Sequence, residues 1–345
     1  MMNQALLSKS RLSDFVSCLV SGHKVVAPVA LQAGHFRFEE VQSLDNISLK
    51  HIPTILPPKK YFMPQRSALL KYDISEGQNM EETVELEKLV IFGVHTCDLA
   101  GIQCLNIVFS DHPKDIHYLA RNSFITIIGL ECSDYCDSFA GCAMLHNHLP
   151  KGGYDLFMTE LAESYYIHIN TRKGEELIEE SPFFEPVTRV AESELKRLRA
   201  RKKEIFTSEL PIRYHDIPRL FEETYDSDIW RQLGEKCLSC GNCTTVCPTC
   251  FCFDILDEPE LDLTRGERVR VWDSCQNEAF AEVAGGENFR RSRTERQRHR
   301  FYRKFSYLME RYGRLFCTGC GRCSRTCMAG IDLKGTIAAV MEERG

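Results

Sequence analysis

Hydrophobic residues follow two different patterns along the first half of the chain. Leu12, Phe15, Val16 and Leu19 recur at helical spacing, which predicts an amphipathic helix over residues 9–20. Several later segments have the pattern of strands, and two of them, residues 88–94 and 123–130, are nearly continuous apolar runs of the kind that is buried on both faces of a sheet. These predicted strands cover residues 24–31, 88–94, 123–130, 154–158 and 165–169.

Helical patterns separate some of these strands, which decides the fold class of the first half. The strand at 88–94 precedes a helical pattern over residues 99–109, and Asp98 stands where it can cap that helix. Strands and helices in alternation are typical of α/β folds. We therefore expect an α/β domain over residues 1–185.

Helices are predicted to dominate the rest of the chain. Residues 186–216 form a charged connector with a solvated helix over 191–206, and a further helix is predicted over 217–233. Apolar runs of strand type are nearly absent beyond this point. We therefore expect a mostly helical second domain over residues 217–345, which makes the whole chain an α+β protein.

Two cysteine runs in the second domain carry the clearest chemical signal. They begin at Cys237 and Cys317, and each has the C-x2-C-x2-C-x3-C spacing that holds [4Fe–4S] clusters. In two-cluster ferredoxins, the fourth cysteine of one run ligates the other cluster. The predicted ligands are Cys237, Cys240, Cys243 and Cys327 for one cluster, and Cys317, Cys320, Cys323 and Cys247 for the second.

Zinc is the alternative occupant of these cysteines. Structural zinc sites take four ligands, often from two separated pairs, so four cysteines in one short run favour a cluster. About 70 residues separate Cys247 from Cys317, a longer interval than in compact bacterial ferredoxins. This spacing resembles that of the alpha-helical ferredoxin domains in respiratory and heterodisulfide reductases.

The composition indicates a reducing compartment. The 345 residues include 17 cysteines, and their clustered spacing indicates metal binding instead of a disulfide framework. The net charge of −6 gives the whole chain no nucleic-acid or membrane signal, and no apolar run approaches the length of a membrane span. The beginning of the chain also lacks the apolar core of a signal peptide. We expect a cytoplasmic protein from an anaerobe.

Four cysteines of the first domain are candidates for a third [4Fe–4S] cluster. Cys97 and Cys132 each follow a buried strand, and the carboxyl ends of parallel strands meet at one edge of a sheet. Cys136 and Cys142 share an irregular loop with Cys132. The alternative is that these four are core thiols and an inert loop.

The remaining cysteines have other expected roles. Cys250, Cys252 and Cys275 either tune a cluster potential through contacts with its surroundings or contribute to the third site. Cys18 and Cys104 lie in predicted helices, where buried and unreactive thiols are the expectation.

A basic helix precedes the second cysteine run. Residues 292–312 place Phe301, Phe305, Leu308 and Tyr312 on one face, so these side chains belong to a core. The surrounding arginines allow a different class of function, an iron–sulfur sensor that binds nucleic acid. The other interpretations are that they raise cluster potentials by stabilising the reduced state, or that they dock an acidic partner.

Motifs of substrate conversion are absent from the sequence. It contains no phosphate-binding glycine loop, no C-x-x-C-H haem site and no H-E-x-x-H motif. No catalytic site of its own is therefore evident, and the predicted role is electron transfer between partners.

Several longer motifs point to one family. They are residues 57–66 (PPKKYFMPQR), 92–101 (FGVHTCDLAG), 247–254 (CPTCFCFD), 272–275 (WDSC), 284–286 (AGG) and 298–301 (RHRF). This set resembles the beta, iron–sulfur, subunit of cytoplasmic NiFe hydrogenases of the sulfhydrogenase type. The corresponding iron–sulfur subunit of anaerobic sulfite reductase shares most of the layout, and the resemblance covers nearly the whole chain.

The resemblance implies an electron-transfer subunit of a soluble complex. In that family, a flavin subunit with FAD and a [2Fe–2S] centre exchanges electrons with NAD(P)H, and the beta-type subunit relays them to a catalytic subunit. The catalytic subunit is a NiFe pair in hydrogenases and a sirohaem subunit in sulfite reductases; residues 57–66 resemble the hydrogenase branch more closely. Family members often carry Cys-Phe-Cys near residue 140, where this chain retains only Cys142, and Cys136 is the possible substitute.

Overall fold

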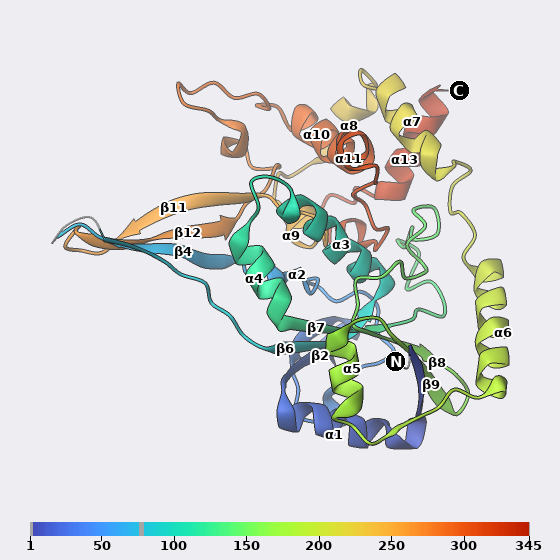
Figure 1. Cartoon of the computed structure of the whole chain (residues 1–345). Helices are drawn as coiled ribbons and strands as arrows, with labels where there is room; N and C mark the ends of the chain where they lie inside the picture. Colours follow the sequence, from blue (N-terminus) through green and yellow to red (C-terminus); the bar gives the residue numbers. More distant parts are fainter. Residues whose placement is uncertain (1–2, 76–78, 345) are drawn as a thin grey trace.

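The computed structural model describes residues 3–75 and 79–344. Residues 1, 2, 76–78 and 345 lie outside the described part of the chain. Of these, residue 345 belongs to the predicted helical domain and the others to the predicted α/β domain. Two sheets, with helices packed on them and beside them, make up the described chain (Figure 1).

An eight-stranded mixed sheet forms the centre of the first half. In sheet order, its strands are β10 (Phe184–Glu185), β1 (Gln4–Ser8), β9 (Ser164–Ile169), β8 (Leu156–Glu160), β7 (Ile125–Leu130), β6 (Leu89–His95), β2 (Lys24–Ala30) and β3 (Phe36–Glu40). Strands β8, β7, β6 and β2 run parallel to one another, and the outer strands pair antiparallel. The apolar runs that the sequence pattern assigned to strands are therefore strands of one sheet.

Apolar cores lie on both faces of this sheet. The helices that cover it are α1 (Leu12–Gly22) and α5 (Arg172–Glu179) on one face, and α3 (Thr96–Ser110) and α4 (Ile116–Phe124) on the other. In β6, Phe92 packs into the core beneath α1, whereas Ile91 packs into the core beneath α3. Because side chains alternate along a strand, burial on both faces requires the unbroken apolar sequence of β6.

The beginning of α3 differs from the sequence prediction. The helix starts at Thr96, so Asp98 lies in its first turn and does not cap it. The Asp98 carboxylate is buried and binds Arg322 instead. Asp98 therefore pairs with a residue more than 200 positions away in the sequence. The residues around Asp98 give no indication of this partner.

A four-stranded antiparallel sheet joins the two halves of the sequence. In sheet order, its strands are β11 (Phe253–Pro259), β12 (Arg265–Trp272), β4 (Arg66–Asp73) and β5 (Asn79–Glu82). The prediction of a second domain nearly free of strands is wrong at β11 and β12, which project from the body as a hairpin (Figure 1). Most of β11 is exposed to solvent, so these strands carry charged residues and lack the apolar run of a buried strand.

Short helices make up most of the remaining chain. They are α2 (Lys59–Phe62), α7 (Ile217–Glu223), α8 (Ile229–Lys236), α9 (Asn242–Thr245), α10 (Arg293–Phe305), α11 (Tyr307–Tyr312), α12 (Arg322–Arg325) and α13 (Leu333–Arg344). The helix predicted over 217–233 is two helices, and the basic helix is interrupted at Ser306. Phe221, Trp230 and Phe301 pack together in the core that these helices share.

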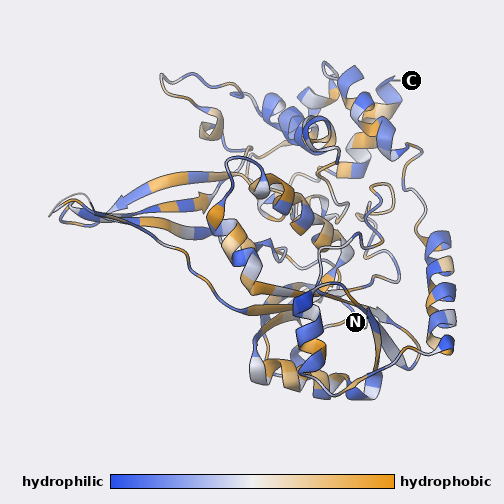
Figure 2. Ribbon diagram, viewed as in Figure 1, coloured by the Kyte–Doolittle hydropathy of each residue, from blue (hydrophilic) through white to orange (hydrophobic). Residues whose placement is uncertain are grey.

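The connector, residues 186–216, is less exposed to solvent than the sequence predicts. Helix α6 (Arg189–Ile205) is largely hydrophilic, as Figure 2 shows, but Lys202 is buried on it. Lys202 Nζ donates to Glu131 Oε1 at 2.9 Å and to the His148 carbonyl at 3.1 Å. These bonds anchor α6 to the loop that follows β7.

No helix in the described part of the chain is long and apolar enough to cross a membrane.

Candidate metal centres

The two cysteine runs form loops of the same shape. Gly241 and Gly321 have φ angles of 75° and 71°, and each immediately precedes a short helix, α9 or α12. Left-handed backbone of this kind favours glycine because it has no Cβ atom. At Gly321, a Cβ atom would also lie 2.9 Å from the backbone of Phe139. The glycines thus allow each chain segment to turn sharply between its second and third cysteines.

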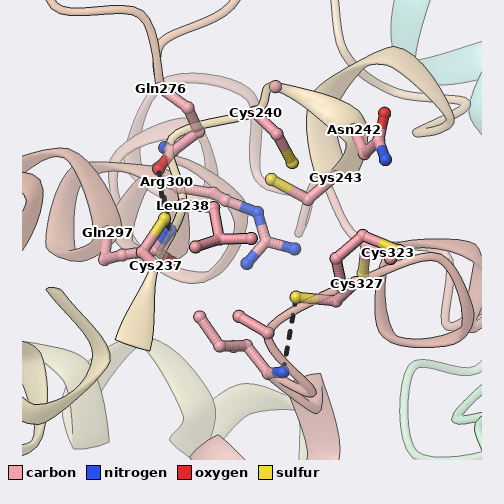
Figure 3. A pocket seen from close by; sticks show the side chains of 14 residues that line it. Cys237, Leu238, Cys240, Asn242, Cys243, Gln276, Gln297, Arg300, Cys323 and Cys327 are labelled. Atoms are coloured by element: carbon pink, nitrogen blue, oxygen red, sulfur yellow. Dashed lines mark hydrogen bonds between the residues drawn. The ribbon is translucent and has the colours of Figure 1, made fainter. Parts of the chain in front are cut away.

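Thiol groups from the two runs line two adjoining cavities. The first cavity is lined by Cys237, Cys240, Cys243 and Cys327 (Figure 3), and the second by Cys247, Cys317, Cys320 and Cys323. Cys243 and Cys323 also border the neighbouring cavity. The structure therefore brings together three cysteines of one run and the fourth of the other, in the sets that the spacing predicts. The assignment of individual iron ligands stays a prediction.

Hydrogen-bond donors surround the thiols of the first cavity. Gln297 Nε2 lies 2.8 Å from Cys237 Sγ, and the Ser239 backbone nitrogen lies 3.3 Å from the same sulfur. The Ile331 backbone nitrogen lies 3.3 Å from Cys327 Sγ. Thiolates that accept N–H hydrogen bonds are the donor set of iron–sulfur clusters, so the residues present fit such a group. Among the described residues, no three His, Cys, Asp or Glu side chains converge on the position of a single metal ion.

Two cations, one buried and one half-buried, compensate the negative charge of these thiolates. Arg300 lines both cavities, and Figure 3 shows its guanidinium pointing into the space between the cysteines of the first. Burial lowers the pKa of Arg300, but the nearby thiolates of Cys243 and Cys323 outweigh this effect and raise it. Lys304, which lines the second cavity, is half-buried; burial lowers its pKa, but the nearby thiolates, that of Cys247 foremost, outweigh this effect and raise it. Both cations come from α10.

Not all of the basic residues near α10 are available to an outside partner. Arg296 and Arg300 are buried, and Arg296 donates to the backbone carbonyls of Arg290 and Arg291. Buried guanidinium groups cannot contact phosphates on the surface. The aromatic residues Phe301 and Phe305 belong to the core, as the helical spacing predicts.

The structure also gathers the four cysteines predicted for a third cluster. Burial raises the pKa of Cys136, and the nearby thiolates of Cys132 and Cys142 raise it further. Burial likewise raises the pKa of Cys97, and Cys132 is among the groups that add to this effect. Thr96 Oγ1 lies 3.7 Å from Cys132 Sγ. All four thiols therefore share one region at the carboxyl ends of β6 and β7, in which Cys97 is buried and the other three are half-buried.

Cys250, Cys252 and Cys275 form a separate group of thiols. The Cys252 thiol lies near the other two, since the thiols of Cys250 and Cys275 both affect its pKa, which is raised overall. None of the three lines either cavity. Cys104 is buried beside Leu308, in agreement with its predicted role as a core thiol.

Sequence reasoning missed two polar residues that contact this region. Gln297 bonds to a cavity thiol, and Lys59 is buried with its Nζ atom 3.1 Å from the Cys250 carbonyl oxygen. Lys59 lies within the family motif at residues 57–66, but neither that motif nor the sequence around Gln297 indicates these contacts. Only the folded chain reveals what they contact.

Comparison with known proteins agrees with this geometry. Residues 236–331 match the family model described as a 4Fe-4S dicluster domain. Over 332 residues, the chain is 34% identical to sulfhydrogenase 2 subunit beta of Pyrococcus furiosus, an alignment that covers 96% of each chain. No solved structure matches the sequence. The chain therefore belongs to the family of sulfhydrogenase beta subunits, as an iron–sulfur electron-transfer protein with a 4Fe-4S dicluster domain over residues 236–331, the segment that contains both cysteine runs.

Proposed function

We propose that the chain relays electrons between a flavin subunit that oxidises NAD(P)H and the catalytic subunit of a cytoplasmic NiFe hydrogenase. The observation that supports this most directly is the common boundary of the two cavities, to which Cys243, Cys323 and Arg300 all contribute. The bound clusters supply reversible one-electron transfer. The eight cysteines of the two runs hold them in the crossed sets, and Arg300 stabilises added negative charge on both.

The first cavity lies close to the protein surface, which suits an exchange of electrons with a partner. Cys240 is exposed, and Leu238 and Met328, which also line this cavity, are 63% and 79% exposed. Large apolar side chains that stand together on a surface favour protein contacts. We propose that one partner subunit docks over Leu238 and Met328.

The second cavity adjoins the four cysteines of the first half of the chain. Electrons could therefore pass from the second cluster to a site formed by these cysteines. Cys320 lines this cavity, and it is also among the neighbours that raise the pKa of Cys97. We propose that Cys97, Cys132, Cys136 and Cys142 hold a third [4Fe–4S] cluster. The three sites then follow one another from the surface at Cys240 to the carboxyl edge of the eight-stranded sheet.

Purification of the tagged chain from its anaerobic host, followed by electron paramagnetic resonance, tests the proposal. We expect a flavoprotein and NiFe hydrogenase subunits to purify with the chain. NAD(P)H should then reduce the clusters in the complex but not in the isolated chain. Recovery of a sirohaem subunit in place of the hydrogenase would assign the chain to the sulfite reductase branch. Absence of any flavoprotein, with clusters that NAD(P)H does not reduce, would contradict the relay.

A further inference from the structure

The base of the hairpin formed by β11 and β12 brings two cysteines together. Cys252 directly precedes β11, and Cys275 lies just beyond the end of β12. Phe253 pairs with Trp272 at this end of the hairpin, and the Asp273 backbone nitrogen donates to the Cys252 carbonyl oxygen at 3.1 Å. Strand pairing therefore holds Cys252 beside Asp273, two residues from Cys275, and the thiols of Cys252 and Cys275 lie close enough to shift each other's pKa.

These thiols differ from those of the two cavities. Cys275 and Cys250 are 3% and 8% exposed, and both lie near enough to the thiol of Cys252 for it to shift their pKa. Cysteines that hold a cube are kept apart around it, whereas thiols in direct contact are placed to form a sulfur–sulfur bond. Their arrangement is thus one of adjacent reactive groups.

A buried ammonium group lies beside these thiols. Lys59 is 3% exposed, and its Nζ atom lies 3.1 Å from the Cys250 carbonyl oxygen and 4.1 Å from the centre of the Trp272 ring. No ion pair within the described residues pairs Lys59 with a carboxylate. A buried cation beside a thiol favours its thiolate form. Lys59 lowers the pKa of Cys250 in this way, but contact with Cys252 and burial outweigh it and raise that pKa above its usual value. Contact with Cys252 also holds the pKa of Cys275 below its usual value.

Hydrogen bonds connect the thiol group to the ligands of both cavities. Gln276 Nε2 lies 3.5 Å from Cys275 Sγ, and Gln297 Nε2 lies 2.8 Å from both Gln276 Oε1 and Cys237 Sγ. On the other side, the backbone nitrogen of Cys250 donates to the carbonyl oxygen of Cys247 at 3.3 Å. The group therefore lies against one ligand of each predicted cluster.

We propose that Cys252 and Cys275 form a dithiol–disulfide couple that stores two electrons beside the two cluster sites. Oxidation breaks two S–H bonds, forms one S–S bond and releases two protons and two electrons. One-electron acceptors of the [4Fe–4S] type, one in each cavity, match this stoichiometry, and reduction reverses the step. The couple requires the clusters, but it does not depend on the partners proposed above.

Electron counting on the full, cluster-loaded chain tests this couple. In an anaerobic coulometric titration, wild type should take up two more electrons per chain than Cys252→Ser or Cys275→Ser, with the same iron content in all three. Cys18→Ser, which removes a thiol from α1, should match wild type. Equal uptake by wild type and both test variants would overturn the proposal.

Mass mapping of alkylated peptides provides an independent readout. The oxidised chain should yield a Cys252–Cys275 peptide that disappears on reduction. Alkylation of all three thiols in the oxidised chain, or a bond from Cys252 to Cys250, would overturn the assignment. Loss of iron or of bound zinc from Cys252→Ser would show that these thiols are metal ligands and would overturn it as well.

Discussion

Asp98 and Arg322 form a buried, bidentate ion pair. Arg322 Nη1 lies 2.6 Å from Asp98 Oδ1, and Nη2 lies 2.8 Å from Oδ2. Arg322 stands between Cys320 and Cys323 of the second run, whereas Asp98 follows Cys97 in α3. The pair therefore fastens the second cysteine loop to the carboxyl edge of the large sheet.

Breaking this pair should destabilise the chain strongly. Asp98→Asn is expected to lower the free energy of unfolding by about 3–5 kcal/mol, because it leaves a buried guanidinium without its counter-charge. Anaerobic chemical denaturation of the cluster-loaded chain measures the loss. Glu160→Gln, which removes the partly exposed pair with Lys9, is the matched control and should cost about 1 kcal/mol at most. Equal losses in the two variants would refute the role of burial.

Arg300 should set the reduction potentials of both clusters. Arg300→Gln removes a positive charge from the common boundary, so the reduced states lose about 1–3 kcal/mol of stabilisation at an effective dielectric constant near 20. This equals a fall of roughly 40–130 mV for one electron. Redox titration followed by electron paramagnetic resonance measures the shift.

Two variants serve as controls for this prediction. Arg300→Lys keeps the charge and should retain most of the potential. Arg311→Gln removes an exposed arginine of α11 that pairs with Asp111, and it should leave both potentials unchanged. If Arg300→Gln shifted neither potential, the proposed electrostatic role would be wrong.

Iron content decides whether the first half holds a third cluster. Three clusters correspond to about 12 irons per chain, and Cys136→Ser should reduce this to about 8 if its thiol is a ligand. Iron analysis and electron paramagnetic resonance of anaerobically purified protein provide the measurement. Cys18→Ser should keep the full iron content. A wild-type protein with only about 8 irons would rule out the third site.

The exposed apolar residues beside the first cavity should control transfer to the partner. Leu238→Glu and Met328→Glu are expected to slow electron transfer within the complex at least about tenfold, because a charge in the centre of a protein contact weakens docking. Stopped-flow reduction by the flavin subunit measures the rate. Leu261→Glu changes a fully exposed leucine on the hairpin loop and should leave the rate unchanged. A slower rate caused by lost iron would not support docking, so iron is measured in each variant.

The sequence predicted those features that depend on local pattern. The spacing from Cys237 to Cys247 specifies a cluster loop by itself, and the apolar run of β6 specifies a strand buried on both faces. The features it missed depend on distant contacts. Nothing near Asp98 indicates Arg322, and nothing near Lys202 indicates Glu131. The hairpin was missed because β11 is exposed and has no apolar periodicity strong enough to stand out.

Strand β12 has β11 on one side and β4, from the opposite end of the sequence, on the other. A fragment that began at residue 217 would keep every cysteine of the two runs, yet it would leave a row of backbone amide and carbonyl groups without partners. Such a fragment is expected to aggregate or to pair with foreign strands. The cluster-bearing half is therefore no portable module, and gene fusions or domain exchanges that separate it from residues 66–73 should yield insoluble protein.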